Sequence, residues 1–151
     1  MIIVDTREKR WEHIKAYFDK HGIEYEVRKL DTGDYQLADK PQIVIDRKRT
    51  LNELSHNLTN RKDHSRFWKE VRRSREQGTK LIVLCEHGGN IKSIDDVVNW
   101  SDKYSGVTGK HLRQELYRVH IAYNVEFLFT NKRSTARKII ELLGGAEDAN
   151  V

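Results

Sequence analysis

The chain has 151 residues, of which 37% are apolar and 34% are charged; this length can bury a core, and the clustered apolar residues exclude a disordered chain. The 28 Lys and Arg residues outnumber the 23 Asp and Glu residues, and the resulting charge of +5 suits a polyanionic partner without specifying one. A single cysteine excludes a disulfide scaffold or a cysteine-rich zinc site within one chain, and it favours a reducing compartment.

The first part of the chain predicts a strand, a helix and further strands. Residues 1–5 form a short apolar run that predicts a buried strand. Residues 8–20 carry apolar side chains at helical spacing, and Gly22 is a typical residue after a helix end. Segments of β-type pattern, separated by turn residues, then predict an antiparallel meander. These segments are 24–30, 34–38 and 42–48.

The second part predicts helices around two strands. Thr50 is placed to cap a short helix, with Glu53 at the capping-box position. The apolar run 80–86 predicts a buried strand, in which Cys85 is more typical of a core residue than of a catalytic thiol. The order of elements predicts a mixed α/β domain in which helices cover a central sheet. The remaining expected elements are a strongly basic helix at 61–76, helices at 93–100 (capped by Ser93), 108–123 and 134–143 (stopped by Gly144-Gly145), and a strand at 125–129.

Domain organisation and location follow from what the sequence lacks. No Pro-, Gly- or Ser-rich linker divides it, so we expect one domain at 1–145 and a flexible tail at 146–151. No apolar stretch approaches the roughly 20 residues that span a bilayer. The N-terminus lacks the basic start and the longer apolar segment of a signal peptide. We therefore expect a soluble, cytoplasmic protein without membrane contact.

The residues that carry chemistry gather around the strand predicted at 42–48. Side chains alternate along a strand, so Asp46 and Lys48 share one face. Arg47, on the other face, must leave the core near the strand end or pair with an acid. Asp34 can lie beside Asp46 if neighbouring strands pair. Two carboxylates and a lysine suit hydrolysis, because carboxylates bind Mg²⁺ and a lysine orients water or stabilises developing charge. An edge strand with a surface ion pair is the alternative interpretation.

Three motifs occur in order along the chain: Val4-Asp5-Thr6-Arg7-Glu8, Gly33-Asp34-Tyr35 and Ile45-Asp46-Arg47-Lys48. They resemble V-D-x-R-E, G-D-Y and E-R-K in the nuclease core of the XPF-type structure-specific endonucleases. That family belongs to the wider PD-(D/E)xK, restriction-endonuclease-like group. Order and spacing agree over nearly the whole chain. The resemblance implies a restriction-endonuclease-like α/β fold with a central mixed sheet flanked by helices.

The resemblance also implies roles for individual residues. Asp34 and Asp46 would bind a Mg²⁺ or Mn²⁺ ion, and Lys48 would assist the attacking water. Asp5 would join the metal ligands, and Glu8 would support the acidic cluster. For Asp5 and Glu8 the alternative is a pair of acids at a helix start, favoured by the helix dipole.

The middle of the third motif carries one implied role and one departure. Arg47 would contact phosphate or hold a carboxylate. Asp46 stands where the family usually has Glu, and its shorter side chain withdraws the carboxylate by about one C–C bond, which bears on rate and metal preference. The predicted catalytic residues are Asp5, Glu8, Asp34, Asp46, Arg47 and Lys48.

A dense run of cations follows the predicted site. A solvated helix face is the ordinary interpretation of such a run. Beside a nuclease motif, it predicts phosphate contacts that are independent of base sequence. Arg61 also matches a position of the family. The predicted nucleic-acid-binding residues are Arg61, Lys62, Arg66, Lys69, Arg72 and Arg73.

The sequence thus predicts a Mg²⁺- or Mn²⁺-dependent DNA endonuclease that acts on branched, flap or junction structures in a DNA-containing compartment such as the nucleoid. A non-catalytic DNA-binding subunit that partners an active nuclease is the alternative, and an RNA nuclease is a third interpretation. Family members often continue into helix-hairpin-helix modules. We therefore expect substrate recognition to use this domain, a homodimer, or a helper protein that supplies DNA-binding modules.

Overall fold

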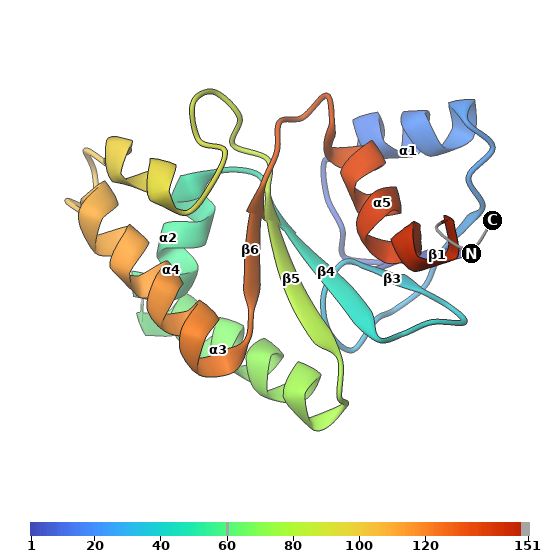
Figure 1. The fold of residues 1–151 in the computed structure, drawn as a ribbon, viewed down its shortest axis with the longest axis horizontal. Helices are drawn as coiled ribbons and strands as arrows, with labels where there is room; N and C mark the ends of the chain where they lie inside the picture. The colour runs from blue at the N-terminus through green and yellow to red at the C-terminus, as the bar shows by residue number, and fades with distance from the viewer. Residues whose placement is uncertain (60, 149–151) are drawn as a thin grey trace.

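The computed structural model contains a mixed sheet flanked by helices on both faces (Figure 1). It describes residues 1–59 and 61–148, with the backbone alone described at 61–64 and 145–148. The strands are β1 (Ile2–Val4), β2 (Tyr25–Val27), β3 (Tyr35–Leu37), β4 (Ile43–Lys48), β5 (Lys80–Cys85) and β6 (Glu126–Phe129). Their order across the six-stranded sheet is β2-β1-β3-β4-β5-β6. This architecture confirms the predicted α/β class.

The strand pairing corrects the predicted meander. Strands β3 and β4 pair antiparallel, as expected, but β1 lies between β2 and β3 and is parallel to the former and antiparallel to the latter. All the residues of β1 are buried, whereas β2 is mostly exposed at the sheet edge. A strand that is apolar on both faces is favoured in the interior of a sheet, and this preference overrides sequence order. Strands β4, β5 and β6 are parallel.

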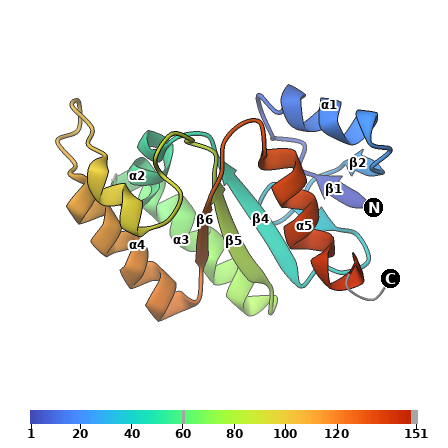
Figure 2. The same ribbon diagram turned by 45° about the horizontal axis from the view of Figure 1, so that its top comes forward.

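Helices form one layer on each face of the sheet (Figure 2). One layer consists of α1 (Glu12–Lys20) and α5 (Thr135–Asp148). The other consists of α2 (Leu51–Thr59), α3 (Arg61–Glu76), α4 (Gly109–Tyr123) and the 3₁₀ helix η1 (Asp95–Asn99). No helix in the described ranges is long and apolar enough to cross a membrane.

The alternation of side chains in β5 builds both cores. Leu81 and Val83 pack with α2, α3 and α4, whereas Ile82 and Leu84 pack with α1 and α5. Cys85 is a free, buried residue of the first core, as the sequence indicates. Burial raises the pKa of its thiol to about 12, so the thiol stays protonated at neutral pH.

Helix α1 begins four residues later than the predicted start of 8–20. Arg10 has a φ of +51°, a left-handed conformation that cannot continue a helix. The turn directs the carbonyl oxygens of Lys9 and Arg10 toward the guanidinium of Arg47, which donates to both. The backbone before α1 is therefore shaped by a contact with β4 rather than by helical spacing.

Two other predicted helix boundaries differ. The segment expected as a helix at 93–100 forms only a short 3₁₀ helix without a side-chain cap, so the Ser93 cap is not formed. Helix α5 continues through Gly144 and Gly145 to Asp148, because glycine ends a helix only where it turns left-handed, and neither has a positive φ. The tail predicted at 146–151 therefore starts inside a helix, and 149–151 lie outside the described residues.

Candidate active site

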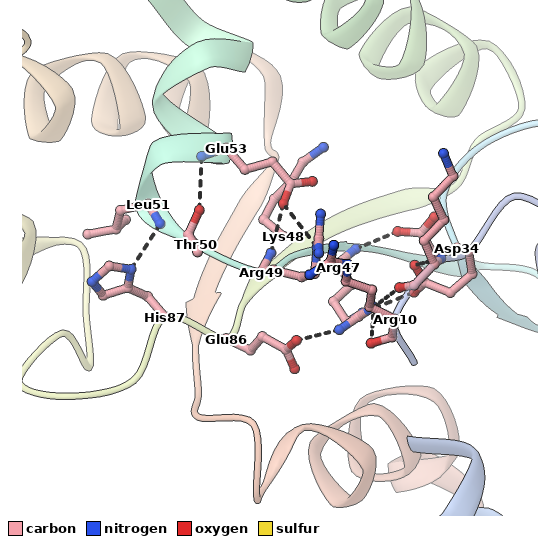
Figure 3. Close-up of polar contacts among 12 residues, drawn as sticks. Arg10, Asp34, Arg47, Lys48, Arg49, Thr50, Leu51, Glu53, Glu86 and His87 are labelled. Carbon is pink, nitrogen blue, oxygen red and sulfur yellow. Dashed lines mark hydrogen bonds and ion pairs between the residues drawn. The ribbon is translucent and has the colours of Figure 1, made fainter. Parts of the chain in front are cut away.

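The end of β4 brings together the carboxylates and the lysine of two sequence motifs. Figure 3 shows Asp34, Arg47 and Lys48 at this strand end. Because β3 and β4 pair antiparallel, Asp34 at the start of β3 lies beside the end of β4. The backbone N–H of Arg47 donates a 2.7 Å hydrogen bond to Asp34 Oδ2 and fixes this carboxylate in place. Asp34, Asp46 and Lys48 line one hollow of ≈ 190 Å³. The two strands thus place both predicted carboxylates next to the lysine.

Asp46 carries an oxygen that accepts no hydrogen bond although it is buried. This oxygen, Oδ2, lies 3.2 Å from Lys48 Nζ in an ion pair. Burial opposes the charge of Lys48, but Asp46 and the nearby acids outweigh it and raise the lysine pKa above its ordinary value. The hollow therefore holds an ammonium group beside a carboxylate oxygen that can accept a further cation.

The surroundings of Asp34 disfavour the ionised form of its carboxyl group. Burial, followed by the negative charges of Asp46 and Glu8, raises the pKa of Asp34 well above its ordinary value. The hydrogen bond from the Arg47 amide acts in the opposite direction and is outweighed. Carboxylates held together against their repulsion are typical of a functional site, and a bound cation would remove the penalty.

Gly33 makes the close approach of Asp34 to β4 feasible. Its φ of +74° is left-handed, a conformation in which only glycine avoids a steric cost. A Cβ at this position would lie 2.5 Å from Val44 Cγ2 and 3.0 Å from the carbonyl oxygen of Ile45. Any other residue would therefore push Asp34 away from Asp46.

Glu70 of α3 is an acidic residue of this site that the sequence motifs do not include. Its Oε1 accepts a 2.9 Å hydrogen bond from the backbone N–H of Gly33. Burial, and then the charge of Asp46, raises the pKa of Glu70 well above its ordinary value. The sequence carried a signal for it, since Glu70 lies three residues after the buried Phe67 and four before the buried Ser74. An acid on the inner stripe of a basic helix indicates a buried partner.

Asp5 does not line the carboxylate hollow but lines the second hollow with Asp34, and its role as a metal ligand stays a prediction. Its Oδ1 accepts a 2.8 Å hydrogen bond from the Leu30 amide, and its Oδ2 accepts a 2.9 Å bond from Arg7 Nε. Although burial acts against its charge, these hydrogen bonds lower the pKa of Asp5 below its ordinary value. The carboxylate thus holds Arg7 and the backbone before Gly33.

Arg47 and Glu8 form a buried pair in the lining of the carboxylate hollow. Arg47 Nε donates to Glu8 Oε2 at 3.0 Å, and Arg47 NH1 donates to Glu86 Oε1. The Arg47 side chain is only 1% exposed. Of the alternatives that the sequence left open, the structure shows Arg47 paired with acids.

Glu86, directly after β5, extends this pair to both helices of one layer. Its Oε2 accepts a 2.7 Å hydrogen bond from Thr135 Oγ1 at the start of α5 and lies 3.0 Å from His13 Nε2 of α1. The buried network of Arg47, Glu8 and Glu86 therefore ties β4 to β5, α1 and α5. It supports the strand end that carries Asp46 and Lys48.

The predicted nucleic-acid-binding residues divide into separate groups. Arg66, Lys69 and Arg73 are exposed and line a second hollow of ≈ 330 Å³, which also has Asp34 in its wall. Arg72 is exposed but lines none of the hollows near the carboxylates. The side chains of Arg61 and Lys62 lie outside the described residues.

The mixed sheet with carboxylates and a lysine at the end of a central strand defines a restriction-endonuclease-like α/β domain. The ERCC4 domain matches residues 4–143, and the chain belongs to the ERCC4 domain family. This match confirms the family that the three motifs indicate. No curated protein matches the chain.

Two solved structures share the fold. XPF from Aeropyrum pernix has a TM-score of 0.72 and 20% sequence identity, and the match covers 97% of this chain and 64% of that chain. XPF from Aeropyrum pernix in complex with DNA has a TM-score of 0.72 and 19% identity, with 98% and 65% covered. This chain therefore spans less than two thirds of the length of either protein.

Proposed function

We propose that this chain is a divalent-metal-dependent DNA endonuclease that hydrolyses phosphodiester bonds. One observation carries the proposal. Asp34 and Asp46 meet in a hollow with the Lys48 ammonium, and a buried oxygen of Asp46 there accepts no hydrogen bond. Membership of the ERCC4 domain family supports the same reaction class.

The donor set suits Mg²⁺ or Mn²⁺. Asp34 and Asp46 would hold the ion through hard carboxylate oxygens. Among the described residues, no group of three His, Cys, Asp or Glu side chains could enclose a metal by itself. Mg²⁺ is commonly held by one or two carboxylates, with water and substrate phosphate completing its shell. When bound, the ion would polarise the phosphodiester and acidify a water molecule.

The protein side chains would position and stabilise the reacting groups. The Lys48 ammonium, fixed 3.2 Å from Asp46, is a donor aimed at the hollow and would stabilise charge that develops on the phosphate. Because its pKa is raised, Lys48 is unsuited to accept a proton from water. The Arg47 amide and the Gly33 turn keep Asp34 in register with Asp46.

The proposed substrate is DNA, with branched, flap or junction structures as the preferred class. XPF from Aeropyrum pernix, which has this fold, is known in complex with DNA, and the exposed cations of α3 suit a phosphate backbone. We further propose that a homodimer or a helper protein supplies additional DNA contacts.

Cleavage of a panel of labelled DNA substrates tests the function. The panel comprises flap, fork, single-stranded and duplex DNA, each incubated with Mg²⁺, with Mn²⁺ and with a chelator. We expect metal-dependent internal cuts that are most frequent at the junctions. DNA binding without cleavage under any of these conditions would instead identify a non-catalytic partner subunit, and cleavage that persists with the chelator would contradict the metal site.

Glu70 provides a graded test of how the site is positioned. Glu70→Ala removes the acceptor for the Gly33 amide, and we expect kcat to fall by about 10- to 100-fold, as for other supporting residues of metal sites. Glu70→Gln retains an acceptor oxygen and should keep most of the activity. Steady-state kinetics on one flap substrate measures both variants. Equal losses in the two variants would show that the charge of Glu70, not its hydrogen bond, is needed.

A further inference from the structure

Three neighbouring hollows share lining residues, beginning with the hollow that holds the carboxylates. The second hollow shares Arg7 and Asp34 with the carboxylate hollow. A third hollow of ≈ 470 Å³ shares Arg7, Asp31 and Arg73 with the second and extends to Lys29 and Gln77. The three hollows therefore adjoin one another from Asp46 to the end of α3, and we call them together the groove.

The exposed wall of the second and third hollows is strongly basic. Its exposed cations are Arg7, Lys29, Arg66, Lys69 and Arg73, and Asp31 is the exposed acid that accompanies them. The other acids of the second hollow are buried or half-buried and already accept hydrogen bonds. Asp5 accepts from Arg7, Glu70 from Gly33, and Asp34 from Arg47. The surface that a ligand meets is therefore mainly positive, and apart from Asp31 its acids are buried or half-buried.

The fold positions the helix face that carries three of the basic residues, and it holds the side chain of Arg7. Positions 66, 69 and 73 lie on one face of a helix. The hydrogen bond from the Gly33 amide to Glu70 ties that face of α3 against the turn that carries Asp34. Arg7, which also lines the hollow, donates to Asp5 and makes a 2.9 Å hydrogen bond to the Leu30 carbonyl oxygen. A prearranged set of cations loses little conformational entropy when it binds an anion.

On the basis of the proposed function, we propose that this groove binds the sugar–phosphate backbone of one DNA strand and leads that strand to Asp34 and Asp46. Its hollows have the size of small-ligand sites, a size that suits the backbone of a single strand. Spaced cations suit the spaced phosphates of a strand. Two other arginines of α3 lie outside the groove, since Arg72 and Arg75 line neither hollow and Arg75 lies 5.5 Å from the Tyr123 ring.

The salt dependence of single-strand binding tests the groove. The affinity of a fluorescent single-stranded oligodeoxynucleotide is measured by anisotropy across a salt series, with a chelator present to prevent cleavage. The triple variant Arg66→Ala/Lys69→Ala/Arg73→Ala should bind about tenfold or more weakly at low salt. Each lost phosphate contact lowers the slope of log K against log salt by about 0.7, so the slope should fall by about 2.

The matched control is Arg72→Ala/Arg75→Ala on the same helix, which should keep the wild-type slope. The proposal that the groove binds the strand would be wrong if the triple variant kept the wild-type slope. It would also be wrong if the slope of the control fell by the same amount for each cation removed. A loss of duplex binding with single-strand binding intact would contradict it as well. Cleavage with Mn²⁺ separates this proposal from the function. If the chain never cuts DNA but the variants show the expected slopes, the groove is supported and the nuclease function is not. If the chain is a metal-dependent nuclease but the slopes are unchanged, only the function is supported.

Discussion

Asp34→Asn should abolish DNA cleavage and leave the fold intact. Asn keeps an oxygen that accepts from the Arg47 amide, so the turn at Gly33 is preserved. It removes the negative charge that would hold the metal ion. Metal catalysis contributes several kcal/mol of transition-state stabilisation, so we expect a loss of roughly 10³-fold or more in kcat. Single-turnover cleavage of a flap substrate measures this loss, and activity within about tenfold of wild type would contradict the role of Asp34.

The same variant should be more stable than the wild type in the absence of metal. The pKa of Asp34 is raised in the folded state, so folded protein binds more protons than unfolded protein between the ordinary and the raised pKa. The stability of the wild type should therefore fall as pH rises through that window. Asn does not titrate in this pH range, so the stability of the variant should change less with pH. At neutral pH we expect a Tm increase of about 3 °C.

Metal addition provides the control for this stability effect. Mn²⁺ should raise the Tm of the wild type, because a ligand that binds only folded protein stabilises it by mass action. The Asp34→Asn variant should respond much less. Thermal scans of both proteins with and without Mn²⁺ give this comparison without any measurement of cleavage, and an equal response would place the metal elsewhere.

Arg47→Ala should cause the largest loss of stability in the chain. The variant leaves Glu8 and Glu86 without their buried cation and removes the donor to two backbone carbonyl oxygens. Breaking a buried ion pair by removing one partner costs about 3–5 kcal/mol, which is a large share of the roughly 5–15 kcal/mol that holds such a domain folded. Urea unfolding monitored by circular dichroism measures the change.

Two variants identify the cause of that loss. Arg49→Ala removes an exposed arginine two positions along the chain, whose Nε lies 3.8 Å from Glu53 Oε2, and should cost less than about 1 kcal/mol. Adding Glu8→Gln and Glu86→Gln to Arg47→Ala should restore part of the stability, because no uncompensated charge then remains buried. If the added substitutions destabilised the protein further, packing rather than charge would explain the role of Arg47.

The regular geometry of β-strands allowed much of the site to be predicted from the sequence. The alternation of side chains puts Asp46 and Lys48 on one face, and the antiparallel pairing of β3 and β4 brings Asp34 to them. These regularities act between neighbours in the chain or across one tight connection. The same locality explains why the basic helix at 61–76 and the buried run of β5 could also be predicted.

Contacts between distant segments could not be predicted in the same way. The sequence does not show that the amide of Leu30 and the guanidinium of Arg7 donate to the carboxylate of Asp5. Glu70 reaches Gly33 from a helix 37 residues further along the chain. No local pattern shows which of several acids a loop or helix will turn toward the site.

By itself, the sequence determined the family, the α/β class and the carboxylate–lysine set, because each depends on short-range spacing and residue type. Only the tertiary structure decided that Arg47 is a buried partner of Glu8 and Glu86, and that α3 turns Arg66, Lys69 and Arg73 but not Arg72 toward the carboxylates. The physical reason is desolvation. A charge acquires its role from the groups that surround it after burial, and those groups come from segments that folding alone brings together.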